Sequence, residues 1–150
     1  MNETIFHLAF PVADIVQTKA FYAEGLGCEI GRESPSAIIL NLYGHQLVAH
    51  VSHEPLVPQK GIYPRHFGLV FTVESSWEDL LVRVQQRGLK FYQQPSKRFI
   101  DSPLEHRTFF LVDPFHNLLE FKHYTRSSAI FGEVACSSVG DQVALQITTS

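Results

Sequence analysis

The sequence predicts an α+β fold built from two βαβββ modules, and three observations lead to this prediction. A strand, a helix and three further strands follow one another twice along the chain. The first strand of each repeat contains a histidine, His7 in the first and His66 in the second. With 150 residues, of which 45% are hydrophobic, the chain has the length and composition of one domain. Neither repeat could bury its own sheet face, so we expect the two modules to share one core.

The first module is predicted from apolar alternation and from the turn residues between its strands. Asp14 is expected to cap a helix that ends near residues 25–27, where two glycines terminate it. Tyr43 and Gly44 are expected to form the turn between the last two strands. A loop with three prolines should follow. The strands of this module are expected at residues 4–11, 28–32, 37–42 and 45–53.

The second module repeats the same order of elements. Ser75, with Glu78 three residues later, fits a capping box and predicts a helix that ends near Gly88. Asp113 and Pro114 form the expected turn before the last strand. The strands of this module are expected at residues 66–70, 89–92, 106–112 and 117–123.

These elements define a single domain over residues 1–123, with module one at 4–53 and module two at 65–123. Residues 124–150 form a C-terminal tail rich in Ser and Thr, which we expect to lie at the periphery or to dock on a partner subunit. Its possible anchors are Ala129-Ile130-Phe131 and Val143-Ala144-Leu145.

Composition and charge exclude several classes of function. The chain carries 12 basic and 15 acidic residues without a basic run, so a nucleic-acid partner is not expected. No apolar stretch reaches the roughly 18–20 residues of a membrane span. The polar, acidic start at residues 1–4 argues against a secretory signal. Cys28 and Cys136 form neither a CxxC motif nor a disulfide framework, so a reducing, cytoplasmic location is expected.

Several short motifs lie in order on the repeat, and together they are fairly specific. From about residue 5 to residue 123 the chain resembles the vicinal oxygen chelate superfamily, which includes glyoxalase I, extradiol dioxygenases, fosfomycin-resistance proteins and metal-free bleomycin-resistance proteins. The resemblance implies two βαβββ modules that form a cupped mixed sheet around a metal, with the site shared across a homodimer. The motifs are His7, Asp14, Phe21-Tyr22 and Gly25-Leu26-Gly27, then His66, Asp113-Pro114, Asn117 and Glu120.

His7, His66 and Glu120 are the expected metal ligands. Two imidazoles and one carboxylate on a rigid sheet suit a divalent metal with open positions, whether Fe, Mn, Zn or Ni. Glu120 has apolar neighbours on both sides, so its carboxylate needs a cation or another partner. Lys122, on the same strand face, is the alternative partner, and a histidine on a strand is often a hydrogen-bonded core residue instead.

The expected function is a divalent-metal-dependent enzyme, dioxygenase-like or glyoxalase-like, whose small substrate chelates the metal through vicinal oxygens. His50 and His106 are the candidate catalytic residues. An ungapped comparison of the last strands of the two modules places Ala49 opposite Glu120, so His50 would point to the other face unless a bulge re-aims it. Gln46 shares the face of His50, and either residue could be a fourth ligand.

Two alternatives remain open at this stage. The first is a metal-free binding protein for small molecules, as in bleomycin resistance, although such proteins usually lack the ligand set present here. The second is a fosfomycin-resistance-like thiol transferase. Phe110 stands where both extradiol dioxygenases and fosfomycin-resistance proteins carry a tyrosine, and Lys97, Arg98 and Arg107 are nearby candidates for binding a phosphonate.

Overall fold

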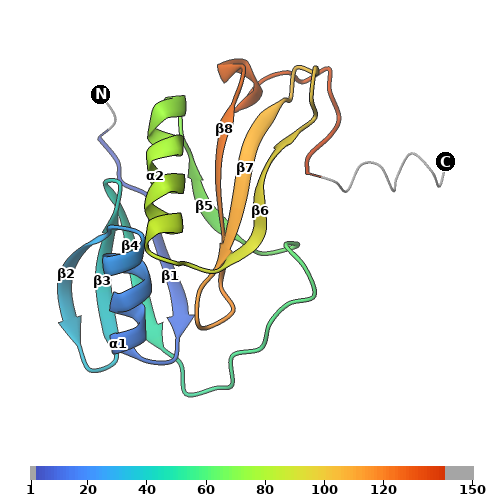
Figure 1. Cartoon of the computed structure of the whole chain (residues 1–150). Coiled ribbons are helices and arrows are strands. Elements are labelled where there is room, and N and C mark those ends of the chain that lie inside the picture. The colour runs from blue at the N-terminus through green and yellow to red at the C-terminus, as the bar shows by residue number, and fades with distance from the viewer. Residues whose placement is uncertain (1–2, 141–150) are drawn as a thin grey trace.

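A computed structural model describes residues 3–140 and contains two four-stranded mixed sheets of identical topology. The expected α+β fold of two βαβββ modules is confirmed. Figure 1 shows the sheets side by side, each with one helix against it. The strand orders are β1-β4-β3-β2 and β5-β8-β7-β6, and in each sheet only the first pair is parallel.

The first module has its helix and turns close to the predicted positions. Asp14 caps the helix by accepting a hydrogen bond from the backbone N–H of Gln17, and the helix widens into a π-helical segment over its second half. Tyr43 and Gly44 both have positive φ, as a two-residue hairpin turn requires. The elements are β1 (His7–Val12), α1 (Ile15–Thr18), η1 (Lys19–Gly25), β2 (Glu29–Ser34), β3 (Ala37–Leu42) and β4 (His45–Val51).

The second module departs from the prediction in three places. Strand β5 begins at Phe67, so His66 lies immediately before this strand and not on it. The helix begins at Glu74, so Ser75 lies inside its first turn and makes no cap: the capping-box prediction was wrong. Strand β6 continues through Pro95, which is tolerated because β6 is an edge strand with an irregular register. The elements are β5 (Phe67–Val70), α2 (Glu74–Gln86), β6 (Phe91–Arg98), β7 (His106–Val112), β8 (Leu118–Tyr124) and η2 (Ser127–Ala129).

One core joins the two modules. Most of the buried aromatic residues of both modules belong to a single cluster between helices and sheets. Polar links cross the same junction: the Tyr22 hydroxyl donates to Asp113 Oδ2 at 2.7 Å, and the Asn117 amide donates to the carbonyl of Pro11 at 2.8 Å. The Phe-Tyr and Asp-Pro…Asn motifs of the sequence therefore hold the two modules together.

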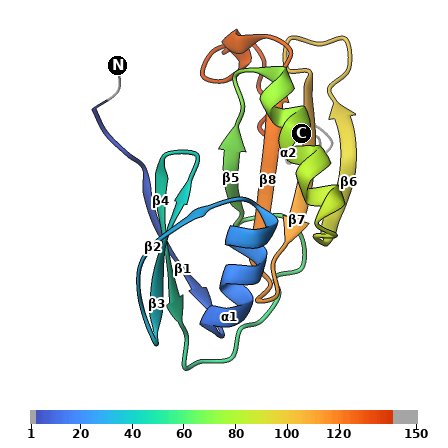
Figure 2. The ribbon, with the colours of Figure 1, turned by 60° about the vertical axis from the view of Figure 1, so that its left-hand side comes forward.

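The two sheets differ in what covers the face opposite their helix. In Figure 2 the first sheet is seen nearly edge-on, with α1 on one side and no described helix or strand on the other. The corresponding face of the second sheet lies under the segment that follows β8, because residues 129–140 line the same cavity as Glu120 and Lys122 of that sheet. No helix among the described residues is long and apolar enough to cross a membrane.

Candidate metal centre

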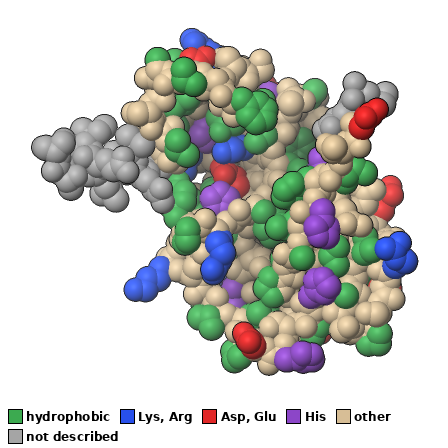
Figure 3. Space-filling model, turned by 180° about the vertical axis from the view of Figure 1, so that it is seen from behind, with side chains coloured by type: hydrophobic (Ala, Val, Ile, Leu, Met, Phe, Trp, Pro, Cys, Tyr) green, Lys and Arg blue, Asp and Glu red, His purple; other side chains and the backbone are tan. Residues whose placement is uncertain are grey.

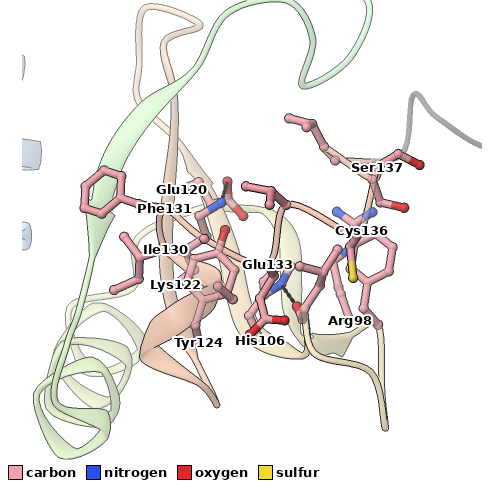
Figure 4. A pocket seen from close by; sticks show the side chains of 18 of the residues that line it. Arg98, His106, Glu120, Lys122, Tyr124, Ile130, Phe131, Glu133, Cys136 and Ser137 are labelled. Atoms are coloured by element: carbon pink, nitrogen blue, oxygen red, sulfur yellow. Dashed lines mark hydrogen bonds and ion pairs between the residues drawn. The ribbon is translucent and has the colours of Figure 1, made fainter.

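A cavity of about 750 Å³ lies on the face of the second sheet that α2 does not cover. Strands β6 to β8 form its floor, the loop before β5 forms one wall, and residues 129–140 form another. Figure 3 shows a hollow in which acidic, basic and histidine side chains meet. In Figure 4 the labelled side chains of the sheet and of the segment after β8 converge on this space, while Phe131 points away from it.

His66 and Glu120 meet in this cavity as the sequence predicts. His66 Nδ1–H donates to the carbonyl of Ile62 at 2.6 Å, which directs Nε2 toward Glu120 Oε1 at 3.2 Å. A hydrogen bond at one ring nitrogen that orients the other is the usual support of a metal-binding histidine. The imidazole Nε2 and the carboxylate therefore lie within hydrogen-bond distance of each other.

The pKa values of the pair reflect this contact. The hydrogen bond to Glu120 raises the pKa of His66 against the opposing effect of burial. Burial alone would raise the pKa of Glu120, but the hydrogen bond from His66 and the charge of Lys122 outweigh it and hold that pKa below its ordinary value. Glu120 is therefore a buried carboxylate kept ionised, as a metal ligand must be.

Two further residues fix the position of the Glu120 carboxylate and of its strand. The Thr108 hydroxyl, on the neighbouring strand β7, donates to Glu120 Oε2 at 2.6 Å. Gly68 on β5 is the register partner of Glu120, and a Cβ at this position would lie 1.6 Å from the Glu120 carbonyl oxygen. The close approach of the two strands therefore requires glycine.

His7 does not join this pair within one chain. It is exposed on the uncovered face of the first sheet, where its Nδ1–H donates to Gln46 Oε1 at 2.8 Å. Its Nε2 is thereby oriented in the same manner as that of His66. Within residues 3–140, no group of three or more His, Cys, Asp or Glu side chains is placed to hold a metal ion.

The strand registers correct the comparison between the modules that places Ala49 opposite Glu120. Gly68, two residues after His66, pairs with Glu120, and Ala9, two residues after His7, pairs with Val48. Val48 therefore occupies the position of Glu120, and Ala49 is buried beneath the helix. The ungapped comparison failed because it was one residue out of register.

The two candidate fourth ligands lie on the first sheet, away from His66. Gln46 pairs with His7 across the strands and orients it. His50 is exposed and pairs with Pro11, four residues beyond His7, which is about 13 Å along a strand. Neither side chain lines the cavity that holds His66 and Glu120.

His106, the other candidate catalytic residue, lies in the cavity. Its Nδ1–H donates to the carbonyl of Leu104 at 2.9 Å, which leaves the lone pair on Nε2. Burial lowers the pKa of His106, and the charges of Lys122 and Arg98 contribute to the same shift. A neutral imidazole with a lone pair at Nε2 can accept a proton.

Other residues that form the cavity could not be identified from the sequence. The Ile62 carbonyl orients His66, but a backbone acceptor in a loop leaves no side-chain signal. The tail contributes Glu133, Cys136 and other lining residues, and the short apolar stretch that contains the buried Ala129 was the one sign that it is anchored. The second suggested anchor, at 143–145, lies outside the described residues.

Comparison with known proteins agrees with the fold. Residues 4–121 match the model of the Glyoxalase/Bleomycin resistance protein/Dioxygenase superfamily. A glyoxalase/bleomycin resistance protein/dioxygenase from Alicyclobacillus acidocaldarius is 40% identical, covers 86% of this chain and 97% of its own, and superposes with a TM-score of 0.82. No match was found among curated protein sequences.

A more distant solved structure shares the fold. The genomically encoded fosfomycin resistance protein FosX from Listeria monocytogenes is 16% identical and has a TM-score of 0.64, with 86% of this chain and 99% of that chain covered. A mutant of FosX was solved with Mn(II) and 1S,2S-dihydroxypropylphosphonic acid (TM-score 0.63, 16% identity, 87% and 98% covered). The family match and the 40% identity establish that the chain belongs to the glyoxalase/bleomycin resistance protein/dioxygenase superfamily.

Proposed function

We propose that the protein is a divalent-metal-dependent enzyme whose small substrate binds the metal through two neighbouring oxygens. The observation that carries the proposal is the His66–Glu120 pair in the cavity, with its ring oriented by Ile62 and its carboxylate by Thr108. An imidazole and a carboxylate held 3.2 Å apart are ligand types that a divalent metal binds. Bound there, the metal would act as a Lewis acid that stabilises negative charge on a substrate oxygen.

The third ligand in this proposal is His7 of a second copy of the chain. His7 cannot meet Glu120 within one chain, yet its ring is oriented by Gln46 and lies on a sheet face that no described element covers. A homodimer that brings this face to the cavity of the other copy would complete two equivalent sites. The liganded FosX structure supports the choice of a metal enzyme, since that protein shares the fold and was solved with Mn(II).

Within the cavity we assign proton transfer to His106. Its Nε2 carries the lone pair, its lowered pKa keeps the ring neutral near pH 7, and it lines the same space as Glu120. His50 lies on the first sheet and has no such position within the chain. Phe110 contacts the His66 ring edge-on at 5.1 Å and gives the site an apolar side without a phenol hydroxyl.

Elemental analysis of untagged protein, purified without chelator, tests the proposal. Wild type should contain about one divalent metal ion per chain, and Glu120→Ala should contain almost none, because the variant removes the charged ligand. Glu133→Ala, which removes another carboxylate from the same cavity, is the matched control and should keep the metal. Metal retained in folded Glu120→Ala would exclude this site.

If wild type takes up no metal even after reconstitution, the second candidate is favoured: a metal-free protein that binds small molecules. The observation in its favour is the aromatic lining of the cavity, which includes Tyr63, Phe99, Phe110 and Tyr124. Binding of planar ligands, followed by quenching of intrinsic fluorescence, would then be the next measurement.

A further inference from the structure

Two cations line the cavity beside the candidate metal ligands. Lys122 lies on β8 two residues after Glu120, so its side chain faces the same cavity, and Arg98 reaches it from the end of β6. Figure 4 shows the two side chains on different sides of the space. We propose that Lys122, assisted by Arg98, forms an anion subsite that selects substrates with a carboxylate, phosphonate or phosphate group beside the chelating oxygens. This inference rests on the proposed function.

The contacts of Lys122 are weak ones for a lysine that is mostly removed from water. Its Nζ lies 3.7 Å from Glu120 Oε1, longer than a hydrogen bond, and 5.1 Å from the ring of Tyr124. Its side chain is only 26% exposed. An ammonium group with three donors in such a place gains most from a charged acceptor that enters the cavity.

Lys122 is not the sole partner of Glu120. The carboxylate already accepts hydrogen bonds from Thr108 on one oxygen and from His66 on the other. A lysine near a metal ligand also repels the metal ion, which weakens a purely structural explanation of its presence. Binding of a substrate anion next to the metal by the Lys122 ammonium group would explain why a lysine lies at this position.

The charges of the lining residues lead to the same class of substrate. Among the described residues of the cavity wall, Arg98 and Lys122 balance Glu120 and Glu133. Glu133 accepts a hydrogen bond from the Ser128 hydroxyl within its own segment. A divalent ion at Glu120 would leave the cavity with an excess of two positive charges, and a substrate with anionic groups would neutralise it. The Arg98 guanidinium, with its planar fork of donors, suits a carboxylate or phosphonate.

A matched pair of chelators tests the anion subsite. Catechol is a neutral vicinal diol, and 2,3- and 3,4-dihydroxybenzoate carry the same diol with a carboxylate. Their affinities for Zn²⁺-loaded protein are measured by titration calorimetry, since Zn²⁺ is redox-silent. Wild type should bind at least one of the carboxylates about tenfold more tightly than catechol, as a charge-assisted hydrogen bond implies.

Three variants locate that preference. Lys122→Gln should abolish it without weakening the binding of Zn²⁺ or of catechol, and Lys122→Arg should retain most of it. Lys97→Gln is the control, because Lys97 is a more exposed lysine on β6 of the same sheet that pairs with Glu105. The proposal is overturned if Lys122→Gln keeps the preference, or if it weakens Zn²⁺, catechol and carboxylate together.

The same proteins separate this inference from the proposed function. If wild type binds no Zn²⁺, the proposed function fails. The anion subsite is then tested by measuring the binding of inorganic phosphate to the metal-free protein. Phosphate binding that is lost in Lys122→Gln and kept in Lys97→Gln would support the subsite without the metal. Equal phosphate binding by wild type and Lys122→Gln, or none by either, would overturn it.

Discussion

Gly68 shows how one residue determines where the Glu120 carboxylate can lie. It is the register partner of Glu120 in the parallel pair of β5 and β8, and the space for a Cβ is already occupied by the Glu120 backbone. A backbone atom cannot move away as the end of a flexible side chain can. A methyl group at this position must therefore separate the two strands that carry the pocket.

Gly68→Ala should lower the free energy of unfolding by about 3 kcal/mol, at the upper end of the cost of overpacking, and should also weaken metal binding. Urea unfolding and metal titration measure the two effects. Gly61→Ala is the matched control, because nothing lies within 4 Å of a Cβ added there. Equal stability of the two variants would show that β5 and β8 do not approach as closely as described.

At the same scale, side-chain chemistry could be predicted from sequence more readily than its surroundings. The apolar neighbours of Glu120 indicated a carboxylate with a partner, and His66 is that partner. Thr108 and Phe110 are two residues apart on β7, so they share one face of that strand, and both lie in or beside the site. The Ile62 carbonyl orients His66 only because of the conformation of its loop, which no single residue type encodes. The equivalence of Val48 with Glu120 between the two modules likewise depends on the strand register.

Elements were predicted where turn chemistry is strong and mispredicted where it is weak. Asp14, Gly44 and Gly88 marked their helix cap, hairpin and helix end correctly because each supplies a specific backbone conformation or hydrogen bond. Ser75 failed as a cap because the helix already begins at Glu74, with Val73 as its N-cap. The length of β6 was underestimated because proline ends most strands but is tolerated at a sheet edge.

A side chain on the helix of the second module also caps the C-terminal end of the helix of the first module. Arg83 on α2 donates from Nε to the carbonyl of Gly25 and from Nη2 to the carbonyl of Glu24, both at 2.9 Å. These are the last carbonyls of η1, which have no partner within their own helix. Arg83 therefore couples the end of one helix to the surface of the other, in addition to the shared core.

Arg83→Gln should lower the free energy of unfolding by about 1–2 kcal/mol, because two carbonyls lose a charged donor that a shorter amide cannot replace at both. Denaturant unfolding followed by circular dichroism measures the effect. Arg87→Gln, one turn further along and exposed, should change stability by less than about 0.5 kcal/mol. A similar loss in both variants would assign the effect to charge or helix propensity and would exclude this coupling.

At the scale of the whole molecule, each of the two sheets carries a different part of the proposed site. On the second sheet, an imidazole and a carboxylate, those of His66 and Glu120, meet inside a cavity. The first sheet carries His7, whose ring is oriented by Gln46, on an uncovered face. The sequence repeat predicted that His7 and His66 occupy equivalent positions in the two modules, and the strand registers confirm this. It could not predict that one chain keeps them apart, because that follows from how the modules pack against one another through Tyr22, Asp113 and Asn117.

Complementation between two inactive variants tests whether the site is shared. His7→Ala and Glu120→Ala should each fail to bind metal, since each homodimer lacks one ligand in both of its sites. In a mixed dimer one site loses both ligands and the other keeps all three. Random mixing of equal amounts, by unfolding and refolding together, should therefore restore about one quarter of the wild-type metal content.

Co-purification with two different affinity tags confirms that mixed dimers have formed. Mixed dimers without metal would mean that His7 and Glu120 act in the same chain, and metal in His7→Ala alone would remove His7 from the ligand set.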